Sequence, residues 1–169
     1  MSAPDAREKV IQFFDPSRTM EAARAMAGID VVRAFMTGAF PLPPAVALIG
    51  AVVAHVERGR VVMSLIPDES HFNALGTMHG GVIATLFDTA LGCSVQSTIV
   101  AGRTYTTLSI GVNYVRGVTI ATGIIMAEGT VEHVGRSTAL VRGTLRDAEQ
   151  RLLATAESTC MLFDAPLAT

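Results

Sequence analysis

Residues 71–102 read HFNALGTMHGGVIATLFDTALGCSVQSTIVAG, and this stretch decides the fold. From Gly80 to Gly102 its only formal charge is Asp88. An apolar run of this kind predicts a helix, from residue 80 to about residue 101, that other elements must enclose. Polar Thr, Ser and Gln side chains interrupt the run, and no aromatic belt or basic flank marks its ends. We therefore expect a buried core helix and not a membrane span.

Segments rich in β-branched residues lie on both sides of this helix. Residues 46–56 and 60–66 precede it and are separated by a turn at residues 57–59. Alternation in the first segment after the helix predicts one shared face for Thr106, Leu108, Ile110, Val112 and Tyr114. The four strands expected after the helix cover residues 104–116, 119–132, 137–146 and 151–163. Short turns between consecutive strands favour antiparallel pairing, so we predict an α+β fold with an antiparallel β-sheet wrapped around the long central helix.

The first 44 residues follow a different pattern. Apolar residues recur at helical spacing over residues 5–40, and the Asp-Pro-Ser sequence at 15–17 interrupts them, with Ser17 as the expected N-cap of the second segment. The sequence Pro-Leu-Pro-Pro at residues 41–44 then ends helix formation, because proline lacks an amide hydrogen and restricts the residue before it. We predict an N-terminal helical arm over residues 1–44 and a main domain over residues 45–169.

Composition and charge exclude several classes of protein. The 13 basic and 15 acidic residues give a net charge of −2, which provides no positive field for nucleic acid. Charged residues make up 17% of the chain, against roughly 25% in an average domain, which favours an apolar surface that closes against another subunit. The cysteines and histidines show no metal-site spacing, so we expect no metal. Residues 1–9 carry mixed charges and do not resemble a secretory signal, so we expect a cytoplasmic location.

The loop before the helix carries the groups best suited to chemistry. Gly80 and Gly81 begin the helix, where unpaired amides and the positive end of the helix dipole favour an anion or an oxyanion. Glycine is a poor helix former, so its use here indicates that a substrate carbonyl approaches the backbone closely. Asp88 is the second anomaly, because a carboxylate in a buried helix is costly to ionise without a partner. A structural Asp bonded to a neighbouring strand is the alternative interpretation.

The spacing of these residues bears on the oligomeric state. Gly80 and Asp88 are eight residues apart, which is about 12 Å along one helix. Catalytic groups must come within about 3 Å of the reacting atoms, so both residues of one chain cannot act on one carbonyl. Two antiparallel copies of the helix would bring Gly80 of one chain near Asp88 of the other. If both are catalytic, we expect at least a dimer.

The pattern H-x-N-x-x-G-x-x-H-G-G at residues 71–81, followed by Leu-Phe-Asp-Thr-Ala at residues 86–90, resembles the hotdog-fold acyl-CoA thioesterases. The branch most similar is the PaaI-like (phenylacetic-acid-degradation) family. The resemblance covers about residues 45–163 and leaves out the arm. It implies a hotdog fold, hydrolysis of an acyl-CoA to free acid and CoA without a cofactor, and a homodimer or homotetramer with active sites at the subunit interface.

The resemblance also assigns catalytic roles. Asp88 matches the general base or nucleophile, and Gly80 matches the oxyanion-hole amide at the helix start. Asn73 matches the residue that orients the thioester or the water, and His79 matches a histidine that supports the loop. Thr107 matches a hydroxyl residue that assists the carboxylate, with the preceding threonine as the alternative if the register differs by one.

Further residues are expected to contact the substrate. One turn is similar to the family's contact with the pantetheine or nucleotide of CoA: His133, Val134, Gly135, Arg136 and Ser137. Arg116 is expected to meet a phosphate, and Gly81 and Tyr105 complete the substrate-binding set; for both arginines, a solvated turn residue is the alternative. The acyl group stays open between aryl and short or medium aliphatic. The candidates for lining its pocket are Phe72, Met78, Tyr105 and Ser109.

Two other functions stay open. Acyl dehydratases of this fold pair a loop histidine with a glutamate on the helix, but the position that matches the glutamate is Thr85, which cannot serve as an acid or base. A non-catalytic acyl-CoA-binding or sensor module is the other alternative. The buried carboxylate expected at Asp88 disfavours it, because mere binding does not require one.

Overall fold

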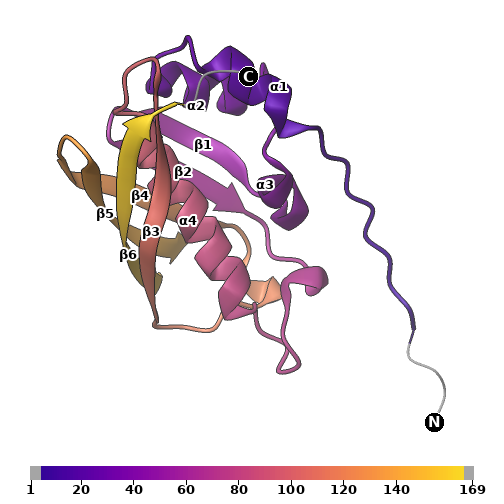
Figure 1. The fold of residues 1–169 in the computed structure, drawn as a ribbon. Coiled ribbons are helices and arrows are strands. Elements are labelled where there is room, and N and C mark those ends of the chain that lie inside the picture. The colour runs from indigo at the N-terminus through magenta and orange to yellow at the C-terminus, as the bar shows by residue number, and fades with distance from the viewer. Residues whose placement is uncertain (1–4, 166–169) are drawn as a thin grey trace.

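The helix α4 (Gly80–Gln96) packs across one face of a six-stranded antiparallel sheet (Figure 1). This arrangement is seen in a computed structural model that describes residues 5–165. The strand order is β1-β2-β4-β5-β6-β3, so β1 and β3 form the two edges. The strands are β1 (Val52–Glu57), β2 (Arg60–Leu65), β3 (Arg103–Tyr114), β4 (Ile125–Val134), β5 (Thr138–Asp147) and β6 (Leu152–Asp164). The other helical elements are α1 (Pro16–Ala23), α2 (Gly28–Thr37), α3 (Pro44–Ile49), η1 (Glu69–His71) and η2 (Ile120–Thr122).

The core lies between α4 and the sheet. Leu86, Phe87 and Leu91 are buried on the helix face that meets the strands, where they join Met63 of β2 in one hydrophobic cluster. Glycine lets the elements approach closely, since a Cβ on Gly143 would lie 2.9 Å from Leu91 Cδ2. The predicted α+β fold, with a sheet around a long central helix, is confirmed. Within residues 5–165, no helix combines the length and the hydropathy needed to cross a membrane.

The first predicted strand begins too early. Residues 46–49, expected to be extended, belong to α3, which starts at Pro44. Proline is well suited to the first position of a helix, because its missing amide hydrogen is not needed there. The expectation that the proline run only ends helix formation is therefore wrong at Pro44.

The strand predicted over residues 119–132 also begins too early. Thr119 caps the short helix η2, and Gly123, with φ of 67°, turns the chain toward β4. The chain uses this segment to leave β3 at the sheet edge, and β4 pairs with β2 in the interior. The predicted pairing of consecutive strands is accordingly wrong for β3 and β4, since β3 pairs with β6.

A β-bulge divides β3 into two halves. The pairing of β3 with β6 shifts register between Thr107 and Ser109, so Leu108 is an extra residue in the edge strand. Beyond the bulge, Ile110 and Val112 pack against the core as predicted. Before the bulge, the odd-numbered residues face inward instead of the even-numbered ones, so Thr106 and Leu108 are exposed. The prediction of one continuous face is wrong at these two positions because of the bulge.

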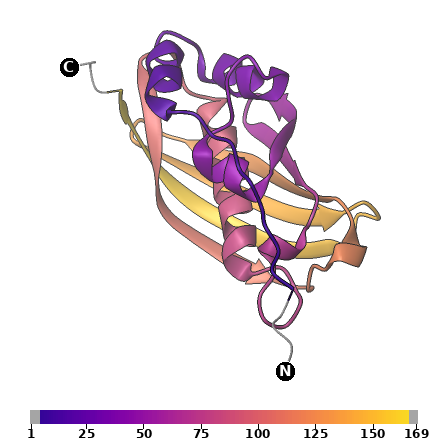
Figure 2. The same ribbon diagram turned by 90° about the vertical axis from the view of Figure 1, so that its right-hand side faces the viewer.

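The N-terminal segment is less helical than predicted. Residues 5–15 contain no helix, and Val10 is 85% exposed. In Figures 1 and 2 this segment runs past α3 toward η1, where Lys9 Nζ lies 2.9 Å from Asp68 Oδ2. The helix α1 begins at Pro16, and its N-cap is Asp15 instead of Ser17. Proline favours an extended residue before it, and Asp15 accepts the amide hydrogen of Ser17.

The second arm helix is part of the core. Val32 of α2 is fully buried in the same cluster as α4, and α2 packs on β1 and α4. The predicted boundary between residues 44 and 45 falls within α3. The division into an arm (1–44) and a main domain (45–169) stays a prediction. Residues 1–4 of that arm and residues 166–169 of that domain lie outside the described residues.

Candidate active site

Asp88 and Thr107 are brought together by α4 and β3. Thr107 Oγ1 donates a hydrogen bond to Asp88 Oδ1 over 2.8 Å. The bulge at Leu108 gives Thr107, and not Thr106, the inward phase of the strand. Of the two threonines that the sequence left open, Thr107 is therefore the one that contacts the carboxylate.

The carboxylate itself is not buried in the single chain. Asp88 is exposed, so the expectation that it lies in an enclosed helix is wrong for one chain taken alone. The reason is that the buried residues of α4 that pack on the sheet do not include Asp88, which lies beside them and meets only the edge strand β3. Its hydrogen bond to the edge strand therefore leaves the carboxylate accessible from outside.

The start of α4 presents a free amide. His79 is the N-cap, and its Nδ1 accepts the amide hydrogen of Gly81 over 2.9 Å. The His79 carbonyl accepts from Val82 and Ile83. Within residues 5–165, no acceptor receives the amide hydrogen of Gly80. Since His79 satisfies the neighbouring amide, Gly80 offers the donor available to a ligand.

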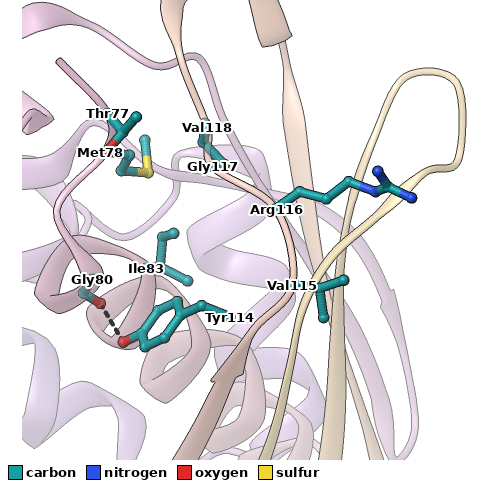
Figure 3. Close-up of a pocket in the computed structure, with 9 residues that line it drawn as sticks. All are labelled: Thr77, Met78, Gly80, Ile83, Tyr114, Val115, Arg116, Gly117 and Val118. Atoms are coloured by element: carbon teal, nitrogen blue, oxygen red, sulfur yellow. Dashed lines mark hydrogen bonds between the residues drawn. The ribbon is translucent and has the colours of Figure 1, made fainter. Parts of the chain in front are cut away.

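A cavity of about 330 Å³ lies beside this helix start and is called the Gly80 pocket here (Figure 3). Tyr114 closes one side, because its hydroxyl donates to the Gly80 carbonyl over 2.8 Å. A Cβ on Gly80 would lie 3.0 Å from that hydroxyl oxygen, so glycine suits this contact. Arg116 borders the cavity, but its side chain extends away from it in Figure 3. The lining is Thr77, Met78, Gly80, Ile83, Tyr114, Val115, Arg116, Gly117 and Val118.

A second cavity, of about 360 Å³, lies at Asp88 and is called the Asp88 pocket. It is enclosed by α1, α2, α3, the outer face of α4 and the first residues of β3. Tyr105 fits here because position 92 is glycine, where a Cβ would lie 2.2 Å from Tyr105 Oη. Sequence reasoning selected Tyr105 but missed Cys93 and every arm residue of this pocket. Nothing in the spacing of the arm indicates that it meets α4.

Asn73 contacts its own turn. Its Oδ1 accepts the Leu75 amide hydrogen over 2.8 Å, and its Nδ2 donates to Thr77 Oγ1 over 3.1 Å. The residue lines neither the Gly80 pocket nor the Asp88 pocket. Its catalytic role stays a prediction, and the structure shows that it shapes the loop leading to His79.

The residues expected to contact CoA lie far apart in one chain. The turn at residues 133–137 joins β4 to β5 near the start of β3, where Arg103 Nη2 donates to the Arg136 carbonyl over 2.9 Å. Arg116 follows the other end of β3, whose 12 residues span roughly 40 Å. The structure does not bring these two sets together within a chain.

The antiparallel sheet wrapped around one long central helix defines the fold class: this is a hotdog fold. Residues 75–154, somewhat less than half of the chain, match the sequence model of the thioesterase superfamily, and this match supports thioester hydrolysis as the activity.

Individual proteins are also similar to this chain. A 1,4-dihydroxy-2-naphthoyl-CoA hydrolase of Listeria monocytogenes serotype 1/2a (strain 10403S) is 26% identical over 111 residues, which cover 66% of this chain and 89% of that protein. The smu.793 protein of Streptococcus mutans UA159, solved with bound acetyl-CoA, is 27% identical with a TM-score of 0.62, over 68% of this chain and 90% of that one. The E. coli PaaI protein from the phenylacetic acid degradation operon shares the fold, with a TM-score of 0.71 and 16% identity over 81% of this chain and 96% of that one.

Proposed function

We propose that the protein hydrolyses acyl-CoA thioesters and that Asp88 activates the attacking water. The observation that carries this proposal is the 2.8 Å bond from Thr107 to Asp88 at an accessible pocket. The smu.793 protein with acetyl-CoA and the naphthoyl-CoA hydrolase support CoA as the carrier of the acyl group. Because Cys93 and Cys160 are free thiols, a reducing cytoplasm is part of the proposal.

The proposed chemistry uses one carboxylate and one amide. Thr107 occupies Asp88 Oδ1, so Oδ2 takes a proton from water as the water oxygen attacks the thioester carbon. The Gly80 amide stabilises the negative charge on the carbonyl oxygen. The carbon–sulfur bond then breaks, the CoA sulfur takes the proton from Asp88, and the free acid leaves. Asp88 ends the cycle as a carboxylate.

We infer that each active site is shared by two chains. In one chain, Gly80 and Asp88 line separate pockets and are about 12 Å apart along α4. The free edge of β3 offers a surface on which a second copy can continue the sheet. A two-fold axis there would place Gly80 of one chain beside Asp88 of the other, and Arg116 of one chain near the 133–137 turn of the other. The proposed assembly is a homodimer or a homotetramer of such dimers.

The experiment is release of CoA thiol by the full chain and by Asp88→Asn, across acetyl-, hexanoyl- and phenylacetyl-CoA. We expect the variant to stay folded and to lose about 10²- to 10⁴-fold in kcat, because general-base action is removed. Turnover near that of the wild type in the folded variant would exclude Asp88 as the base. Binding of acyl-CoA without thiol release by the wild type would favour the sensor alternative.

A further inference from the structure

The Asp88 pocket has an outer wall that the thioesterase match does not include. Its inner wall, with Asp88 and Tyr105, falls within the matched residues 75–154. Its outer wall is formed by Met20 and Ala23 of α1, together with apolar side chains of α2 and α3. Since α1, α2 and α3 all lie before residue 75, the family model does not describe this wall.

The arm is held in place by backbone contacts. The Arg24 carbonyl accepts from the Gly102 amide over 2.9 Å, and the Gly28 amide donates to the Ile99 carbonyl over 2.9 Å. A Cβ on Gly28 would lie 1.8 Å from the Gln96 carbonyl oxygen, so α2 begins as close to the end of α4 as the backbone allows. Figures 1 and 2 both show α1 and α2 at this end of the molecule. The outer wall is therefore fixed at the connection between α4 and β3.

The Asp88 pocket extends along the helix α4. It follows α4 from Asp88 to Gln96, which is about 12 Å of helix. The antiparallel start of β3 lies alongside, with Thr107 bonded to Asp88 at one end and Arg103 at the other. A thioester carbon placed at Asp88 would thus have one of its two substituents directed between α4 and the arm.

The middle of the pocket is uncharged. Burial raises the pKa of the Cys93 thiol to about 12 and also raises the pKa of Tyr105 well above its usual value. Both side chains therefore stay neutral near pH 7, and Met20, Ala23 and Phe35 add apolar surface opposite them. Mostly apolar clefts of this size suit small apolar ligands. The charged groups Arg24 and Arg103 lie only toward the far end.

We propose that the Asp88 pocket binds an uncharged, apolar acyl group and that the arm, through Met20 and Ala23, determines which acyl groups are accepted. This inference rests on the proposed function. A medium aliphatic chain and an aryl group share the required chemistry. The measurement below distinguishes them.

The test compares kcat/KM for acetyl-, hexanoyl-, phenylacetyl- and glutaryl-CoA in the full-length wild type and three variants. Ala23→Phe fills the pocket from α1, and Ala22→Phe is its matched control on the exposed side of the same helix. We expect Ala23→Phe to lower the preference for the better apolar substrate over acetyl-CoA about tenfold, since pocket contacts of this size discriminate by that amount. Ala22→Phe should leave the preference unchanged.

Met20→Ala is the second variant, for use if Ala23→Phe does not fold. Met20 is 58% exposed and contributes little to the core, so we expect Met20→Ala to fold. Loss of its contact should raise KM for the preferred apolar substrate more than it lowers kcat. An unchanged acyl preference in folded, active Ala23→Phe and Met20→Ala would overturn the role of the arm. A wild type that prefers glutaryl-CoA to hexanoyl-CoA would overturn the uncharged pocket. Absence of hydrolysis with every acyl-CoA would instead contradict the proposed function.

Discussion

Thr107 Oγ1 lies 2.8 Å from Asp88 Oδ1 and joins the edge strand of the sheet to the one acidic residue of the central helix. A hydroxyl donor at this place fixes the rotation of the carboxylate and occupies one of its oxygens. Because the carboxylate cannot rotate freely, its second oxygen, Oδ2, points in a fixed direction. Thr107 can therefore set the position of the attacking water without contacting it.

Loss of this hydroxyl should slow turnover. We expect Thr107→Val to lower kcat by about 10- to 100-fold, because a hydrogen bond to a charged group contributes roughly 1.5–3 kcal/mol. Thr107→Ser should retain most of the activity. Thr106→Val is the matched control, since Thr106 is exposed on the other face of β3. An equal loss in Thr106→Val would show that the solution register differs from the one described.

Two inactive variants should complement each other if the active site is shared. Asp88→Asn removes the carboxylate, and Gly80→Pro removes the free amide while proline remains tolerated at the first position of a helix. In a mixed dimer, one site carries both lesions and the other carries neither. With random pairing of chains across a two-fold interface, co-refolded variants should recover up to about a quarter of wild-type activity. No recovery, in samples where mixed dimers are detected, would mean that each site belongs to one chain.

Position 92 should not accept a side chain. In Gly92→Ala the new methyl would lie 2.2 Å from Tyr105 Oη, and we expect a loss of about 1–3 kcal/mol in the free energy of unfolding through overpacking. The double variant Gly92→Ala/Tyr105→Phe should recover part of the loss, because the clashing oxygen is gone. Denaturant unfolding of the three variants, including Tyr105→Phe alone, measures this coupling. Additive losses would contradict the contact.

Stability should fall in mild acid because of His71. Its side chain is buried, and Nδ1 accepts the Asp68 amide hydrogen over 3.1 Å. Burial lowers the pKa of His71 below its usual value of 6.5; Asp68 opposes this effect and Lys9 adds to it. The unfolded chain therefore binds a proton that the folded chain does not, so the stabilising contribution is complete above pH 6.5 and declines as the pH falls below it.

The measurement is the thermal midpoint between pH 5 and pH 7.5 in the wild type, His71→Gln and a control, His133→Gln, which alters an exposed histidine. The decline amounts to at most about 1.4 kcal/mol per pH unit for one proton. His71→Gln should show a flatter profile, and His133→Gln should follow the wild type. A wild-type slope in His71→Gln would assign the effect to another group.

The sequence predicted those parts of the molecule that rest on local patterning. The charge-poor run around Asp88 predicted the central helix, and β-branched segments predicted four strands, β2, β3, β5 and β6, close to their actual positions. The strands β1 and β4 both begin later than predicted, because a short helix precedes each of them: α3 before β1, and the turn between Thr119 and Gly123 before β4. Capping contacts of this kind depend on one or two side chains and are weak signals in a sequence.

The site was predictable where a motif carried it and not where tertiary packing did. Asp88 and Thr107 were selected by resemblance, and the structure brings their side chains into contact. The exposure of Asp88 was not predicted, because the run is apolar on all sides and does not indicate which face of the helix packs on the sheet. The arm wall at Ala23 was also missed, since a surface helix and a pocket wall have the same amphipathic pattern.

The bulge at Leu108 has a consequence for insertions and deletions in β3. Tyr105 and Thr107 face α4 from one side of it, and Ile110 and Val112 reach the core from the other. Removal of Leu108 would restore strict alternation and keep both pairs on the same face, because positions 107 and 110 would then be two residues apart. A single-residue deletion in this strand is therefore compatible with both the pocket and the core only when it removes the bulge, whereas one between the members of either pair would turn a side chain to the opposite face.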